Sequence, residues 1–260
     1  MEENKALPEA LRDPSLRKDL AYDEALIEQQ DAEDVEAIDD EYWDLGTREP
    51  RILITTSRDP SAKLKQFAKE LKLIIPNATR VNRGNINVKD LPAAAISNGL
   101  TDLIIVHEHK GTPSGMIISH LPHGPTAYFT LSQVVLRHDV TSYSIPTSYP
   151  HLIFDNLSDD NKVAKRVKRI LQALFPPPAY NSKTTRVMTF ANSNDHISFR
   201  HHLYIQDKSI PGVNGIRLSE AGPRFEMRLY LIKRGTFDDK SAEDEWSLKL
   251  YQRRTKNALG

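Results

Sequence analysis

The sequence predicts an α/β protein of two similar α/β halves that follow an acidic N-terminal leader. Residues 51–76 and 151–176 share one pattern of apolar strand, polar turn, amphipathic helix and proline. The net charge of zero over 260 residues hides a separation of charge, because residues 1–49 hold 17 acidic and 5 basic side chains. The leader therefore has a net charge of −12 and the remainder a net charge of +12. The remainder also holds every histidine.

The leader, residues 1–49, combines many charges with few large apolar side chains. Such a segment buries too little apolar surface for a core of its own, so we expect it to be partly helical or disordered. Its acidic start lacks an apolar stretch and predicts neither a secretory signal nor a mitochondrial presequence. The longest apolar runs, such as Leu103–Val106, are too short to cross a bilayer, so no membrane partner is expected. The absence of cysteine excludes disulfides and thiolate zinc sites and fits a reducing compartment.

The first half, at about residues 50–140, is predicted to begin with a strand at 52–54 and a helix that ends at Pro76. Apolar side chains three and four residues apart form one stripe on that helix, and Pro60 suits its first turn. Further along the chain, Gly and Pro turns separate the predicted elements. These are strands at 79–81, 102–107, 116–119 and 127–131, a helix at 90–98 that ends before Gly99, and a turn at 111–115.

The second half, at about residues 150–256, repeats the opening strand at 152–154 and a helix that ends at Pro176. Asp159 or Asp160 is the predicted N-cap of this helix. Strands are predicted at 186–192, 197–206, 215–220 and 224–233, and residues 242–256 form either a helix or a last strand. In the strand at 224–233, alternation predicts one buried face and an opposite face on which an ion pair within the chain competes with an RNA contact. The buried face holds Phe225, Met227, Leu229 and Leu231, and the opposite one holds Arg224, Glu226 and Arg228.

The basic residues form two groups that predict contact with a polyanion, of which nucleic acid is the usual one. The second repeat helix places five cations opposite its apolar face with no acid among them, and a second group surrounds the turns of the first repeat. A solvated surface of mixed sign is the alternative. The candidate RNA-binding residues are Arg58, Lys63, Arg80, Arg83, Lys162, Lys165, Arg166, Lys168 and Arg169.

Patterns typical of catalysis are weak. His107-Glu108-His109 places two imidazoles on the same side of a strand end, but it is not the helical HExxH motif and no carboxylate cluster completes a metal site. The turn at 111–115 lacks the lysine of a phosphate-binding loop. We therefore expect no catalytic residues, no metal and no cofactor.

Three ordered segments carry a resemblance to a known family: ITTSRDPSAKLKQFAKEL at 54–71, DLIIVHEHKGTPSGMIISHLPHGPTAYFTL at 102–131 and GPRFEMRLYLIKRGTFD at 222–238. They resemble the Brix-domain ribosome-biogenesis proteins over roughly residues 50–255. Within that family, NRGN at 82–85, LPHGPTA at 121–127 and HLIFDN at 151–156 are most like the Brix member of the Imp pair of U3 small nucleolar ribonucleoprotein proteins.

The resemblance implies a fold of two α/β halves, each like the anticodon-binding domain of some tRNA synthetases. It also implies a nucleolar, non-catalytic RNA-binding subunit of the small-subunit processome that acts in early pre-rRNA processing toward 18S rRNA. The implied partners are U3 small nucleolar RNA, pre-ribosomal RNA, the M-phase phosphoprotein scaffold and the sister small RNA-binding Imp protein. An alternative is a module that docks a scaffold peptide, with RNA contact incidental. A nuclease that uses the histidines is a third hypothesis.

Overall fold

The computed structural model describes residues 41–42, 45–140, 146, 148–176, 184–206, 216–248 and 258–259. The chain divides into two units, Met1–Trp43 and Asp44–Gly260, and the second contains every element named below. The prediction for the leader falls almost entirely on residues outside the described ranges. None of the described helices is both long and apolar enough to span a membrane.

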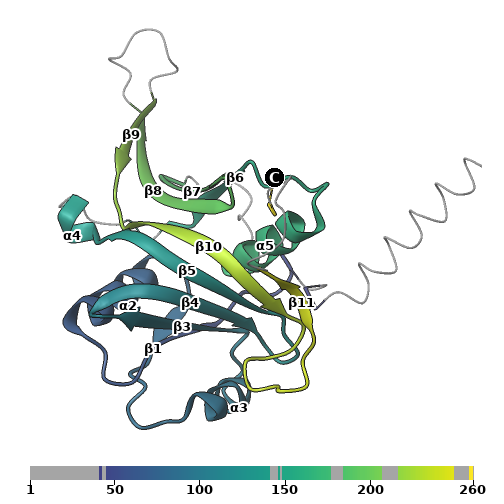
Figure 1. The fold of residues 1–260 in the computed structure, drawn as a ribbon. Helices are drawn as coiled ribbons and strands as arrows, with labels where there is room; N and C mark the ends of the chain where they lie inside the picture. Colours follow the sequence, from purple (N-terminus) through teal and green to yellow (C-terminus); the bar gives the residue numbers. More distant parts are fainter. Residues whose placement is uncertain are drawn as a thin grey trace, which may run out of the picture. The chain divides into compact units, whose positions relative to one another are not determined.

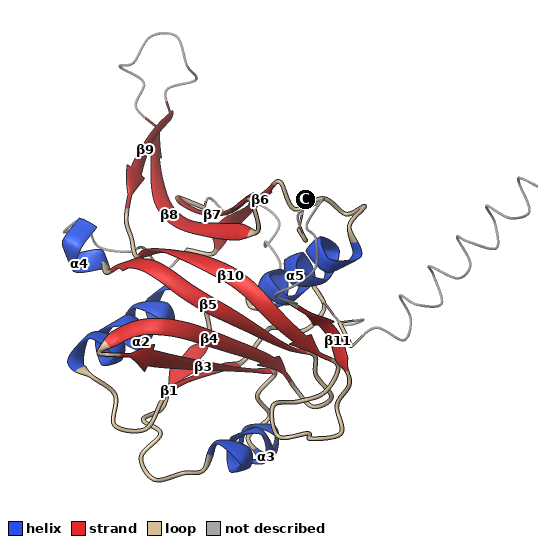
Figure 2. Cartoon of the chain, in the orientation of Figure 1, coloured by secondary structure: helices blue, strands red, loops and turns tan. Residues whose placement is uncertain are grey.

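Strands dominate the described part of the second unit, with helices packed against them (Figures 1 and 2). The first half contains β1 (Ile52–Thr56), α2 (Ala62–Ile74), β2 (Ala78–Arg80), the 3₁₀ helix η2 (Val88–Asp90), α3 (Leu91–Ser97), β3 (Asp102–His109), β4 (Thr112–His120), β5 (Thr126–Val135) and α4 (Arg137–Val140). The second half contains β6 (Pro150–Asp155), α5 (Lys162–Ala173), β7 (Arg186–Ser193), β8 (His196–Gln206), β9 (Ile216–Glu220), β10 (Arg224–Lys233) and β11 (Asp244–Ser247).

The duplicated pattern is confirmed, because both predicted repeats form a strand followed by a helix. The N-cap residues stand at the same offset: Ser61 Oγ accepts from Leu64 N, and Asn161 Oδ1 accepts from Val163 N. Asn161 therefore replaces the predicted Asp159 or Asp160, and α2 starts two residues after Pro60.

The strands of the two halves join into one sheet in the order β2-β1-β3-β4-β5-β10-β8-β7-β6, with β9 on β8 and β11 on β10. Each half runs from a parallel pair, β1 with β3 or β6 with β7, into antiparallel strands that end at the centre. The central strands β5 and β10 pair antiparallel with each other. The α/β fold class with two similar halves is thus confirmed. The strands that join the halves, β5 and β10, occupy the same place in their own halves.

The main core lies on the face of the sheet that carries α2. A row of aromatic rings crosses from one half to the other, with centroids 5.5 Å apart between Phe67 and Phe225 and 4.7 Å apart between Phe225 and Phe199. The row continues through Phe190 to Phe154. On the opposite face of the first half, α3 covers a second cluster of buried residues: Leu53, Leu91, Ala95, Leu103, Ile105 and Leu121. The row of aromatic rings buries apolar surface between the two halves and so holds them together.

Two predicted details are wrong. Residues 112–115 belong to β4, and only Lys110 and Gly111, both at positive φ, form the tight connection to β3. In β10 the register shifts between Leu229 and Leu231, so Ile232 is buried while Leu231 is only half-buried. Of the two alternatives for 242–256, the described part forms the last strand, β11, at 244–247, and residues 249–257 lie outside the described ranges.

Candidate nucleic-acid interface

The first basic group gathers at the carboxyl ends of the parallel strands β1 and β2. Arg80 stands opposite Ile54, and Val81 N donates to Ile54 O at 3.0 Å, so the chain leaves both strands at the same edge. Arg58 follows β1 and Arg83 follows β2. Partial burial, and then the positive charge of Arg58, lower the pKa of Arg83. The charge of Arg58 therefore acts on Arg83 at this edge of the sheet.

These cations remain free to meet an anion. In the described part of the chain, no acidic side chain pairs with Arg58, Lys63, Arg80 or Arg83. The Nε of Arg83 donates to Ile86 O at 3.2 Å, which orients the guanidinium and leaves its terminal amino groups available. Crevices at the carboxyl ends of parallel strands are common ligand sites in α/β folds.

The N-terminus of α2 lies at the same edge, but a carboxylate already occupies it. Ser61 N donates to Glu108 Oε1 at 2.8 Å, and Ser61 Oγ donates to Glu108 Oε2. Glu108 thus takes the place that a phosphate could take at a helix N-terminus. Lys63 stands exposed in the first turn of this helix.

The second basic group differs from its prediction, because acids from elsewhere in the chain reach α5. Arg166 Nε lies 3.2 Å from Glu245 Oε1 of β11, and Lys168 Nζ lies 2.8 Å from Asp159 Oδ1 in the turn before the helix. The hydrogen bond from Lys168 lowers the pKa of Asp159. Arg166, Lys168 and Arg169 are half-buried, and Ala164 rather than Val163 is fully buried on the opposite face. Only Lys162 and Lys165 stay exposed.

The histidines do not converge. A register shift next to His107 pairs His107 with Gly115 and Glu108 with Pro113, so the extra residue, Ser114, lies on β4. His107 is half-buried against Gly115, while His109 is exposed. Burial lowers the pKa of His107. Across the described residues, His, Asp and Glu nowhere gather in groups of three that could hold a metal ion.

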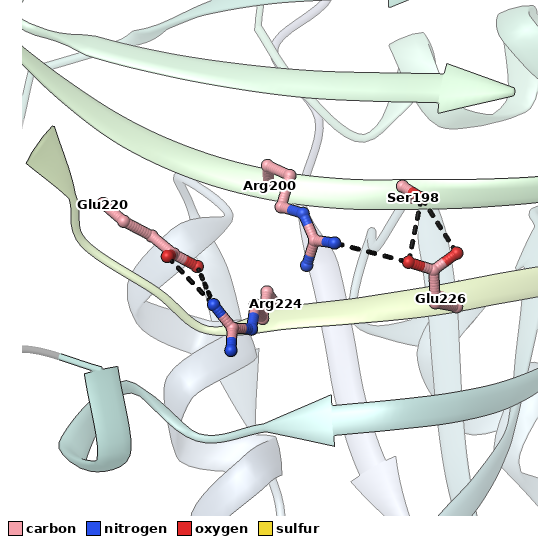
Figure 3. A network of polar contacts seen from close by, with 5 residues as sticks. All are labelled: Ser198, Arg200, Glu220, Arg224 and Glu226. Carbon is pink, nitrogen blue, oxygen red and sulfur yellow. Dashed lines mark hydrogen bonds and ion pairs between the residues drawn. The ribbon is translucent and has the colours of Figure 1, made fainter. Parts of the chain in front are cut away.

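A polar network on β8 and β10 contains a cation that the sequence analysis left out (Figure 3). Glu226 accepts from Ser198 Oγ at 2.8 and 2.9 Å and pairs with Arg200 Nη2 at 3.4 Å. Arg224 pairs with Glu220 at 3.1 Å rather than with Glu226. Ion pairs within the chain therefore hold both arginines. Alternation along residues 196–206 could have placed Arg200 on this face, but the sequence gives no sign of the register that brings it to Glu226.

The sequence of this chain is similar to that of a known protein family. A family model described as the Brix domain matches residues 57–231. The chain belongs to the Brix-domain family. Among its Brix-domain relatives is "U3 small nucleolar ribonucleoprotein protein imp4" of Schizosaccharomyces pombe, which is 53% identical over 245 residues, 94% of this chain and 82% of that protein. The human protein named "U3 small nucleolar ribonucleoprotein protein IMP4" is 47% identical over 250 residues, 95% of this chain and 82% of that protein.

A solved structure supports the fold. "Crystal structure of probable ribosomal biogenesis protein from Aeropyrum pernix K1" aligns with a TM-score of 0.50 and 19% identity. The alignment covers 69% of this chain and 96% of that one. The family model and the curated relatives confirm the family resemblance expected from the three sequence segments.

Proposed function

We propose that this Brix-domain protein is a non-catalytic, RNA-binding assembly factor of the U3 small nucleolar ribonucleoprotein and the small-subunit processome. It acts in the nucleolus on early pre-rRNA processing toward 18S rRNA and helps to position U3 small nucleolar RNA on pre-ribosomal RNA. Its protein partners are the M-phase phosphoprotein scaffold and the sister small RNA-binding Imp protein. Residues 50–256 act as the Brix domain, and residues 1–49 as its acidic leader.

The names of the relatives support the assignment of this protein to the U3 small nucleolar ribonucleoprotein. Both curated relatives described above are named as proteins of the U3 small nucleolar ribonucleoprotein, and each matches this chain over more than nine tenths of its length. Identity of about one half over nearly the whole chain supports a role in ribosome biogenesis. The finer assignments depend on the surface of this chain.

The observation that carries RNA binding is the set of unpaired cations at the carboxyl edge of β1 and β2. Partial burial first, and then the positive charge of Arg58, lower the pKa of Arg83, so in the free protein the two guanidinium groups repel each other. A phosphate between them removes that repulsion and accepts planar, bidentate hydrogen bonds from the guanidinium groups. The ion-paired cations of α5 are expected to contribute less to RNA affinity. Arg166 and Lys168 must first break their ion pairs with Glu245 and Asp159.

The test compares two pairs of cations in the full chain. We expect Arg58→Ala/Arg83→Ala to weaken binding to U3-derived RNA by about tenfold at moderate salt and to reduce the slope of log affinity against log salt by about one. Lys162→Ala/Lys165→Ala removes the same charge from the exposed face of α5 and serves as the matched control. Filter binding across a salt series, with U3-derived and unrelated RNAs, provides both quantities.

The outcomes separate the candidates. Equal losses for both pairs would assign binding to the general positive charge rather than to the edge of β1 and β2. No RNA binding by the unmodified chain at low salt would reject the proposed function and favour the peptide-docking alternative. Circular dichroism of each variant checks that the fold survives, as expected for exposed or half-exposed cations.

A further inference from the structure

The two ends of the sheet differ in a way that the duplication makes visible. In the first half, β1 is paired on both sides, by β2 and by β3, and both neighbours run parallel to it. Its counterpart β6 pairs with β7 in the same way. Among the described residues, no strand pairs with β6 on its other side, so β6 is an edge of the sheet.

The side chains of β6 are exposed where those of β1 are covered. Ile52 and Ile54, on the α2 face, are 0% exposed, whereas their counterparts Leu152 and Phe154 are only half-buried. On the other face, Ile153 is 41% exposed, compared with 8% for Leu53. The edge strand therefore presents apolar side chains on both faces, beside backbone groups that no strand among the described residues pairs with.

Between its two ends, the edge also lacks the features with which proteins usually prevent strand addition. β6 pairs with β7 over six residues with no register shift and contains no lysine, and its proline and its one acid, Asp155, stand at the first and last positions. At the opposite end of the sheet, β2 has only three residues and ends at Arg80, so that edge is short and charged. Of these two edges, β6 is the one suited to accept another strand.

The geometry points to β6 as the docking edge for an extended peptide of a partner protein, which joins the sheet as a strand parallel to β6. The strand β2 shows the arrangement within this chain, since Ala78, Thr79 and Arg80 stand opposite Ile52, Leu53 and Ile54. The equivalent register on β6 places the peptide opposite Leu152, Ile153 and Phe154. The peptide is expected to alternate, with apolar side chains over Leu152 and Phe154 and backbone hydrogen bonds to the open edge. This surface is separate from the RNA-binding edge and goes beyond the proposed function.

A second copy of the chain is a less suitable occupant. A closed twofold dimer through this edge pairs β6 with β6 antiparallel, because the same edge meets itself across the axis. The neighbours of β1 and β6 within this chain are all parallel. A partner peptide can adopt the parallel direction that β2 uses.

The first measurement is hydrogen exchange on the full-length protein. The amides of β6 that do not bond to β7 are expected to exchange fast in the free, monomeric protein. A random-peptide display library, selected on the full chain, then provides the probe. A selected peptide is expected to slow exchange along residues 150–155 and to show an alternating apolar pattern.

Two variants complete the test. Ile153→Lys places a charge on the edge and is expected to weaken the selected peptide about tenfold, while RNA affinity stays unchanged. Leu218→Lys is the matched control, because Leu218 is 59% exposed on β9 and should leave peptide affinity unchanged. Slow exchange of all β6 amides in the free monomer would show that this chain covers its own edge and would overturn the proposal. Dimerisation lost on Ile153→Lys, failure to select any peptide, or protection elsewhere than β6 would overturn it equally.

Discussion

The two halves keep one order of strands but differ on the face of the sheet opposite the main core. In the first half, residues 75–101 connect α2 to β3 and include α3, which covers Leu53, Leu103 and Ile105. In the second half, the shorter connection 174–185 joins α5 to β7. There, Thr189 and Ala191 take the places of Leu103 and Ile105 beside the exposed Ile153. The duplication thus preserves the main core, and the halves differ where surfaces can bind partners.

The same comparison applies to a histidine position that is half-buried in the first half and fully buried in the second. His120 on β4 and His201 on β8 stand at equivalent places, opposite Asp102 and Met188. Asp102 Oδ1 lies 2.8 Å from His120 Nδ1, whereas His201 Nε2 accepts from Arg186 Nε at 3.3 Å. The first half places a carboxylate next to its histidine, and the second half places a guanidinium group there. The second arrangement also ties the halves together through Arg186.

The largest expected effect comes from breaking that tie. Arg186 is buried and donates to Ile74 O at the end of α2, to Ser148 O and to His201. Arg186→Ala leaves two carbonyl groups and an imidazole without their donor and should lower the free energy of unfolding by about 4 kcal/mol. Urea denaturation measures this loss.

Arg224→Ala is the control for that change. Arg224 is 41% exposed and pairs with Glu220, so its loss should cost less than about 1 kcal/mol. If the two variants lost equal stability, the buried contacts of Arg186 would not join the halves in the way described.

The next effect depends on pH. Burial above all, and the charge of Arg186 further, lower the pKa of His201 to about 4. Between pH 6.5 and 4 the unfolded chain binds a proton at this histidine and the folded chain does not, so stability falls as pH decreases through this window. The contribution is complete above pH 6.5, and about 3 kcal/mol is lost by pH 4.

His201→Gln removes the titration and should flatten the dependence of unfolding free energy on pH across that window. His196→Gln, at a half-exposed position in the same strand, is the control and should leave the slope as it is. A wild-type slope that survives His201→Gln would place the acid sensitivity elsewhere.

Local patterns were sufficient to predict most of the elements. The apolar stripes and prolines predicted α2 and α5, and alternation predicted β10 with its correct bounds. The register shift at Leu229 to Leu231 was not predictable, because no turn residue marks it. The pairing of β5 with β10, which joins the halves, is a contact between distant segments that local patterns do not contain.

The candidate site was predicted in part. Helical periodicity placed the cations of α5 on one face, but it could not show that Glu245 and Asp159 come from outside the helix to pair with two of them. The grouping of Arg58 with Arg83 depends on the parallel pairing of β1 and β2. Tertiary contacts therefore decide which cations stay available, and the sequence alone treats all nine alike.

A smaller effect concerns a pair near the turn of the β3–β4 hairpin. His107 stands opposite Gly115, and a Cβ on Gly115 would lie 2.0 Å from the imidazole ring. At the equivalent place in the second half, Ser193 stands opposite His196, so there the histidine is on the other strand. Gly115→Ala should cost about 2 kcal/mol, because the ring must leave its half-buried position.

A double-mutant cycle sharpens this comparison. His107→Ala removes the ring, so adding Gly115→Ala to that variant should cost little. The change His196→Ala in the second half should also cost little, since this half-exposed ring faces Ser193 rather than a glycine and, among the described residues, makes only an exposed hydrogen bond to Asn194 O. Additive losses in the cycle would show that the ring and the glycine are not coupled.

The smallest effect tests whether the ion pairs of α5 withhold its cations from RNA. Lys168 Nζ binds both oxygens of Asp159, at 2.8 and 3.0 Å, in a turn exposed to solvent. Asp159→Asn removes the charge of this partner and should raise RNA affinity by about twofold. The slope of log affinity against log salt should become steeper by less than one. Asp160→Asn removes the same charge one residue further along and is the matched control, since general repulsion of RNA would respond to both alike. An affinity raised equally by the two variants would assign the effect to net charge, and the difference between α5 and the edge of β1 and β2 would then not arise from ion pairing.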